Sequence, residues 1–82
     1  MAASTMPMAR LNVGQSARIH GFSESCPPEI RHRLASLGFI HGTTVCRMRR
    51  APLGDPSVYR VMDYEICFRR HEADFIECDV AS

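Results

Sequence analysis

Residues 43–80 read TTVCRMRRAPLGDPSVYRVMDYEICFRRHEADFIECDV. Short runs of Thr, Val, Tyr and Phe recur in this segment, and β-branched and aromatic residues favour strands. The sequence APLGDP at residues 51–56 has the prolines, glycine and aspartate of a loop, which we expect at a hairpin tip. We therefore predict strands over residues 43–50, 57–62, 65–69 and 75–80, with a single helical turn at residues 71–74.

One strand and one helix are predicted before this segment. Residues 18–22, RIHGF, alternate between polar and apolar side chains, as a half-buried strand does. The sequence PPEIRHRLASL at residues 27–37 opens with prolines, which suit the first turn of a helix. Ile30, Leu34 and Leu37 then form one apolar stripe at helical spacing. Gly38 is expected to end this helix in a left-handed conformation.

The predicted fold is mostly β, with about five short strands and one short α-helix. Strands of this length close best as a small, strongly bent barrel, because closure removes exposed sheet edges. The helix is expected to plug one end of the barrel. The residues on the apolar side of each element should form the core: Ile19, Leu34, Leu37, Val45, Ile66, Phe68, Ile76 and Val80.

The chain has 82 residues, which is the size of a single domain. We expect residues 1–9 to be a frayed tail and residues 10–82 to form the domain. No segment has the ~20 apolar residues of a membrane span, and the first ten residues lack the apolar centre of a signal peptide. The expected location is the cytoplasm, where the four cysteines would be reduced.

No motif of a known catalytic centre occurs in the sequence. It has no phosphate-binding G-x-x-x-x-G-K-[ST], no G-x-G-x-x-G, no H-E-x-x-H and no G-x-S-x-G. A chain of this size also has little room for a deep pocket beside its core. The net charge is only +1, and no aromatic residues interleave with the arginines to stack on bases. The sequence therefore favours neither an enzyme nor a nucleic-acid-binding protein.

The cysteines are widely spaced and form no C-x-x-C pair, which excludes a zinc site built from neighbouring residues. Cys78 shares the parity of the core residues of its strand, so it is predicted to be buried. Cys26 precedes the helix and Cys67 has the outward parity, and with His20 or His32 they could hold Zn(II) or Fe(II). The interpretation leaves open whether such a site lies within one copy or between two, and no cofactor is expected to be required.

A partner-binding site is predicted at the end of the hairpin. Three arginines crowd the strand before the loop and form either a solvated face or a contact to an anionic surface. Turn chemistry does not explain Leu53 in the middle of the loop, so this side chain either folds back or is offered to a partner. The candidate residues are Arg47, Arg49, Arg50, Pro52, Leu53, Gly54 and Asp55.

The order of these features resembles the FeoA family of small proteins of bacterial ferrous-iron uptake. The resemblance rests on RLASLG at residues 33–38, Gly42-Thr43, the loop APLGDP, Phe68-Arg69, Glu72-Ala73 and Ile76. It implies an SH3-like barrel without catalytic activity. It also implies a partner, the FeoB-type membrane transporter with a cytoplasmic GTP-hydrolysing domain, which would hold the protein at the inner membrane.

Two other functions remain open from the sequence. One is a small module that binds or senses iron or zinc through Cys and His, and the other is an interaction barrel with a different target. A homodimer is a further association that the sequence leaves open.

Overall fold

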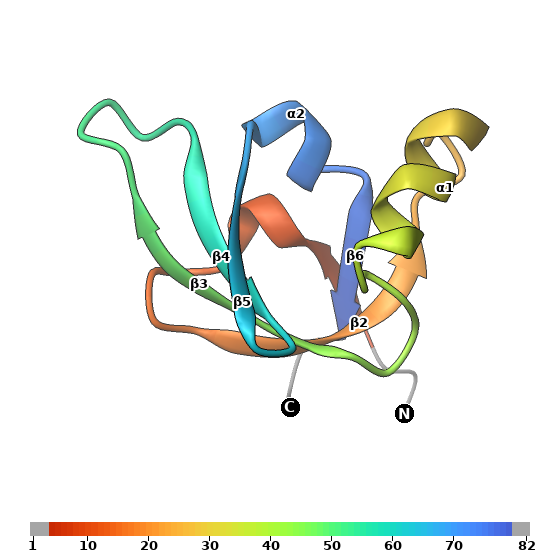
Figure 1. Ribbon diagram of the computed structural model, residues 1–82, viewed down its shortest axis with the longest axis horizontal. Coiled ribbons are helices and arrows are strands. Elements are labelled where there is room, and N and C mark those ends of the chain that lie inside the picture. Colours follow the sequence, from red (N-terminus) through yellow and green to blue (C-terminus); the bar gives the residue numbers. More distant parts are fainter. Residues whose placement is uncertain (1–3, 80–82) are drawn as a thin grey trace.

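The computed structural model describes residues 4–79, and within them a single six-stranded antiparallel sheet curls around the core (Figure 1). The strand order in the sheet is β1-β6-β2-β3-β4-β5. The strands are β1 (Thr5–Pro7), β2 (Ser16–Phe22), β3 (Thr44–Arg50), β4 (Ser57–Val61), β5 (Tyr64–Phe68) and β6 (Ile76–Asp79). The helical elements are η1 (Met8–Arg10), α1 (Pro28–Ser36) and α2 (Arg70–Ala73). None of these helices is long and apolar enough to cross a membrane.

Two register shifts allow the sheet to bend so strongly. In β2 the pairing with β6 shifts between Ile19 and Gly21, and in β3 the pairing with β4 shifts between Arg47 and Arg49. A β-bulge of this kind increases the local twist of a strand and turns its direction. β2 and β3 can therefore bend around the core, as Figure 1 shows for these two long curved strands.

The core fills the inside of the curved sheet. Phe39 and Phe68 pack edge to face at its centre, with ring centroids 5.0 Å apart. The buried cluster consists of Met8, Leu11, Ile19, Leu34, Phe39, Val45, Tyr59, Val61, Phe68, Ala73, Ile76 and Cys78. Five of the predicted core residues are confirmed: Ile19, Leu34, Val45, Phe68 and Ile76. Leu37 and Ile66 are half-buried against this cluster, and Val80 lies outside the described residues.

α1 begins and ends as the sequence predicts. Pro27 precedes its first turn and provides no side-chain cap, and Glu29 lies in that turn. Gly38 follows the helix with a φ of +105°, the left-handed conformation that glycine adopts without strain. The Tyr64 hydroxyl donates a hydrogen bond to the Leu37 carbonyl, which fastens the helix end to β5.

The prediction of a frayed tail over residues 1–9 is wrong for residues 5–9, and the domain begins before residue 10. β1 pairs with β6, with Met6 opposite Cys78, and the Met8 side chain is completely buried. These residues have no periodicity of their own that indicates a strand. They are ordered because β6, more than 60 residues later in the chain, offers them an edge to pair with.

Candidate partner-binding site

The loop between β3 and β4 has a defined shape. The Ala51 N–H donates to the Pro56 carbonyl at 2.9 Å, and the Gly54 N–H donates to the Ala51 carbonyl at 2.8 Å. The second bond closes a four-residue turn, and Gly54 accepts a φ of +90° at its end.

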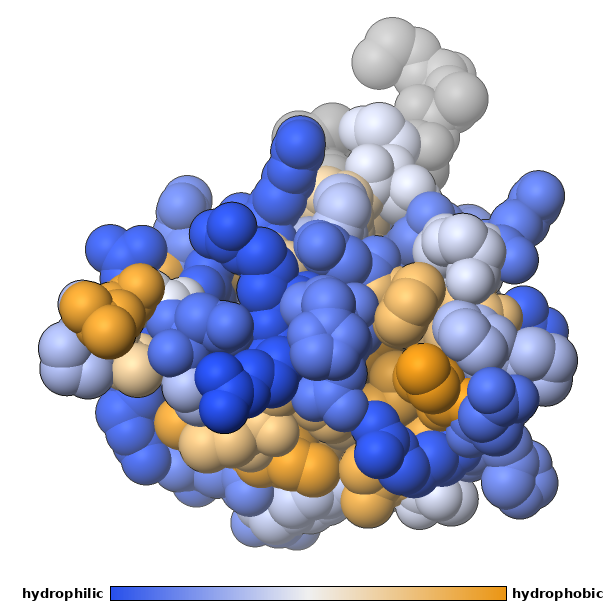
Figure 2. Space-filling view, turned by 90° about the horizontal axis from the view of Figure 1, so that it is seen from above, coloured by the Kyte–Doolittle hydropathy of each residue, from blue (hydrophilic) through white to orange (hydrophobic). Residues whose placement is uncertain are grey.

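Leu53 lies at the tip of this turn and is 96% exposed. Of the two positions that the sequence left open, the side chain therefore takes the one in solvent. Figure 2 shows an apolar projection at the hairpin end of the molecule with hydrophilic surface beside it. Single exposed apolar side chains are common on protein surfaces, so the exposure of Leu53 makes this side chain available to a partner without by itself marking a site.

Asp55 connects this loop to α2. One carboxylate oxygen, Oδ1, accepts a hydrogen bond from the Arg70 N–H at 2.9 Å. The bond brings the junction between β5 and α2 beside the loop, and there Arg69 and Arg70 are exposed. Sequence reasoning missed these two arginines, although the run Arg69-Arg70-His71 was visible as a short basic segment.

Arg47, the first of the predicted partner-binding arginines, forms its hydrogen bonds within the domain. Its half-buried guanidinium donates through Nη1 to the carbonyls of Leu11 at 2.6 Å and Ala9 at 3.2 Å. Its Nη2 and Nε donate to the Ser57 hydroxyl at 2.6 and 3.2 Å. The bulge in β3 turns this side chain inward, and the arginine joins the N-terminal segment to the β3–β4 hairpin.

Arg49 and Arg50 both remain exposed, but their charges differ in availability. The Arg49 guanidinium forms an ion pair with Glu65 on β5, with Nη2 and Oε1 3.0 Å apart. An exposed pair of this kind adds little stability, but it partly neutralises the arginine. Within residues 4–79 the guanidinium of Arg50 has no such carboxylate partner, so its charge is available at the base of the loop.

The four predicted metal ligands do not come together. Cys26 lies before α1 as predicted, but it is only 3% exposed, whereas the predicted metal site needed an exposed thiol. Cys67 is exposed on β5 and His32 is exposed on α1, whereas His20 lies on β2. No group of three or more His, Cys, Asp or Glu side chains in residues 4–79 is arranged to hold a metal ion.

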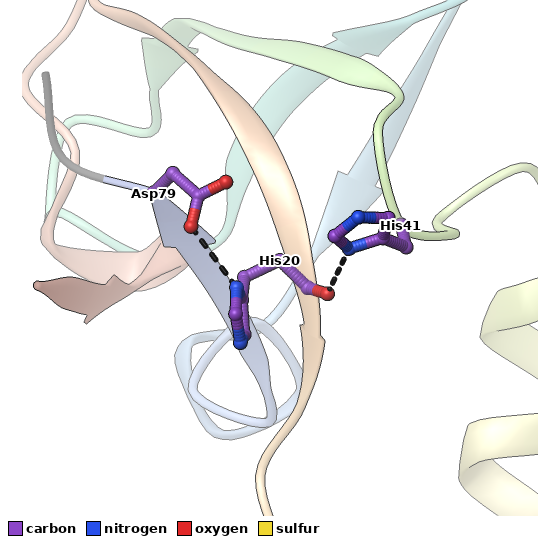
Figure 3. A network of polar contacts seen from close by, with 3 residues as sticks. All are labelled: His20, His41 and Asp79. Carbon is purple, nitrogen blue, oxygen red and sulfur yellow. Dashed lines mark hydrogen bonds and ion pairs between the residues drawn. The ribbon is translucent and has the colours of Figure 1, made fainter. Parts of the chain in front are cut away.

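His20 belongs instead to a polar network with Asp79 and His41 (Figure 3). Its Nδ1 lies 3.0 Å from Asp79 Oδ1 on β6, and His41 Nδ1 donates to the His20 carbonyl at 2.7 Å. The two imidazole rings lie edge to face with centroids 5.9 Å apart. These exposed contacts join β2 to β6 and to the turn before β3, so the polar groups of His20 are engaged within the domain.

A sequence model of the FeoA domain matches residues 6–80. The chain belongs to the FeoA family. FeoA of Chlorobium tepidum has the same fold, with a TM-score of 0.82 and 30% identity, over 94% of this chain and 71% of that one. FeoA of Stenotrophomonas maltophilia, an SH3 domain protein crystallised with zinc, has a TM-score of 0.80 at 26% identity, over 90% of this chain and 89% of that one. The predicted family and the SH3-like class are therefore confirmed.

A further FeoA relative is part of a much longer protein. The fusion of Fe(2+) transport protein A with the Fe(2+) transporter FeoB in Porphyromonas gingivalis is 44% identical over 52 residues. The match covers 63% of this FeoA chain and 6% of the fusion protein, so the chain spans a small part of that relative's length.

The buried thiol of this FeoA domain predicts a loss of stability at alkaline pH. Burial, with a smaller effect of Asp79, raises the pKa of Cys78 to about 12. Above the ordinary thiol pKa the unfolded chain loses the Cys78 proton while the folded chain keeps it. The free energy of unfolding should therefore fall between pH 9 and 12, by at most about 1.4 kcal/mol per pH unit from this group.

Urea titrations of the parent and of Cys78→Ala at several pH values measure this effect. The variant should show a shallower decrease over the same pH range, because burial also raises the pKa of Tyr59 and this second group remains. Equal pH slopes in parent and variant would contradict the assignment to Cys78.

Proposed function

We propose that this FeoA-family protein assists ferrous-iron uptake by docking on the cytoplasmic GTP-hydrolysing domain of a FeoB-type transporter. It would act in the cytoplasm as a binding protein without catalysis of its own, held at the membrane by its partner. The exposed Leu53 on a hydrogen-bonded loop is the observation that supports docking. The identity of the partner is supported by the P. gingivalis protein, in which the two parts are covalently joined.

The loop has the properties of an anchor. A fully exposed leucine gains about 1.5–3 kcal/mol when it becomes buried. The two backbone bonds of the loop and the bond from Asp55 to α2 already fix its conformation. A loop that is ordered before binding loses little entropy on docking, so more of the burial energy appears as affinity.

Leu53→Ala should weaken binding to the partner domain by about 1–2 kcal/mol, roughly 5- to 30-fold in Kd. The melting temperature should stay close to that of the parent, because the side chain contributes nothing to the core. Titration calorimetry with the purified cytoplasmic domain of the transporter gives the Kd, and a thermal melt checks the fold.

Ile40→Ala is the matched control, since Ile40 is also an exposed aliphatic residue but precedes β3 instead of following it. The length of β3, about 23 Å, separates the two positions. Iron uptake by a deletion strain complemented with each variant extends the test to the cell. If Leu53→Ala binds as tightly as the parent, the docking surface lies elsewhere.

Metal binding is the second candidate function, and the zinc in the crystal structure of S. maltophilia FeoA favours it. In this chain a site at Cys67 would need donors from a second copy, because no cluster of three ligands forms within residues 4–79. Equilibrium dialysis with zinc, combined with the oligomeric state in the presence and absence of the metal, separates this function from docking. Zinc-dependent dimers that are lost in Cys67→Ser would support it.

A further inference from the structure

Three arginines from two separate segments lie near the base of the exposed loop. Arg50 is the last residue of β3, and Arg69 and Arg70 lie at the junction between β5 and α2. In the strand register Arg50 lies opposite Ser57, and Ser57 lies opposite Phe68. The last residues of β3 and β5 therefore lie at the same end of the sheet. Figure 1 shows the β3–β4 loop and α2 at this end.

The Asp55 carboxylate holds these segments together. Its bond to the Arg70 N–H ties the loop to the first residue of α2, although 15 residues separate the two in sequence. The backbone at Arg70 is therefore held beside the loop that carries Leu53. We call Arg50, Arg69 and Arg70 the arginine collar.

The guanidiniums of the arginine collar form no ion pairs within the described part of the chain. Other arginines of this region are occupied: Arg33 pairs with Glu72 at 2.6 Å and Arg49 pairs with Glu65. None of the three collar guanidiniums forms an ion pair within residues 4–79, and all three residues are exposed. Three positive charges thus lie near the segment that carries Leu53. Two carboxylates accept backbone hydrogen bonds beside them: Asp55 from the Arg70 N–H and Glu72 from the Arg69 N–H.

We infer that the arginine collar recognises a ring of carboxylates around an apolar pocket on the protein that receives Leu53. This inference rests on the proposed docking function and specifies the chemistry of the partner surface. Arginine suits such contacts because its planar guanidinium binds carboxylates through paired hydrogen bonds. The pocket would supply affinity, whereas the charges around it would accelerate association and orient the two proteins.

A protein surface fits these features better than a membrane or a nucleic acid. A peripheral membrane protein usually buries a continuous apolar face, and here one leucine projects from the loop. Neither the loop at residues 50–55 nor residues 69–71 contains a Phe, Tyr or Trp that could stack on a base.

The test compares two triple variants in binding to the cytoplasmic domain of the transporter over a range of salt concentrations. In one, Arg50, Arg69 and Arg70 are replaced by Gln. In the matched control, three other exposed arginines without ion pairs in residues 4–79 are replaced by Gln: Arg18, Arg31 and Arg60. The collar variant should bind about tenfold more weakly at low salt, through slower association, and this difference should largely disappear at 1 M salt.

Asp55→Asn provides a second measurement that does not depend on removing arginines. Asparagine keeps an oxygen that can accept the Arg70 N–H bond but removes one negative charge beside the collar, and the Glu72 carboxylate beside Arg69 stays paired with Arg33. This variant should associate faster than the parent at low salt. Unchanged or slower association would contradict the inference, because a basic partner surface or an uncharged one predicts those results.

The other outcomes distinguish the inference from the function on which it rests. If the parent fails to bind the transporter domain at any salt concentration, the docking function itself is wrong. If the parent binds and both triple variants share its salt dependence, docking stands and the carboxylate ring is wrong. Tighter binding of the parent to vesicles containing 30% phosphatidylserine than to the domain would assign the collar to lipid headgroups and overturn the inference.

Discussion

Leu34→Ala is expected to lower the free energy of unfolding by about 2–5 kcal/mol. Leu34 is fully buried, and it is the residue through which α1 enters the core. Truncation removes apolar contacts and leaves a cavity that the packed core cannot easily fill. A domain of this size has a total stability of only about 5 kcal/mol, so the variant should be partly or fully unfolded at 37 °C.

Urea unfolding followed by circular dichroism measures this effect. Leu37→Ala is the matched control, because Leu37 lies on the same stripe but is only half-buried. Leu37→Ala should lower the free energy of unfolding by clearly less than Leu34→Ala does. If the two variants unfold alike, or if Leu34→Ala melts with the parent, α1 does not depend on Leu34 for its packing on the core.

Arg47→Met is expected to produce the second large effect, a loss of about 2–4 kcal/mol. Methionine keeps much of the aliphatic volume but removes every hydrogen bond that the guanidinium donates. The carbonyls of Ala9 and Leu11 and the hydroxyl of the buried Ser57 would lose their charged donor. A bond from a charged group contributes about 1.5–3 kcal/mol. The expected loss stays below the sum over the four bonds, because Arg47 is half-buried and water can replace part of what the guanidinium donates.

The loss should also have a distinct location in the molecule. Residues 5–10 should open first, because Arg47 fixes the carbonyls that follow β1. Hydrogen exchange of the amides in this segment reports that opening directly. Arg49→Met is the control and should cost well under 1 kcal/mol, since the Arg49–Glu65 pair is exposed. Uniform destabilisation without faster exchange in residues 5–10 would contradict the assigned role.

Much of the fold followed from local patterns in the sequence. Alternating residues predicted the strands around Ile19 and Ile76, and helical spacing predicted the stripe that contains Leu34. The loop APLGDP was recognisable from its turn residues, and a small barrel followed from the number and length of the strands. The SH3-like class came from the resemblance to the FeoA family. Such signals are local because strand parity, helix periodicity and turn conformation depend on residues only a few positions apart.

The tertiary structure alone decided the roles of several charged and N-terminal residues. Arg47 and Arg50 look alike in sequence, yet a bulge turns one inward to three oxygen acceptors while the other stays in solvent. Arg70 joins the candidate site only through its bond to Asp55. Met8 is buried only because β1 finds the edge of β6. These outcomes depend on contacts between segments that are distant in sequence. The identity of a residue does not reveal which distant atoms the folded sheet brings within hydrogen-bond distance of that residue.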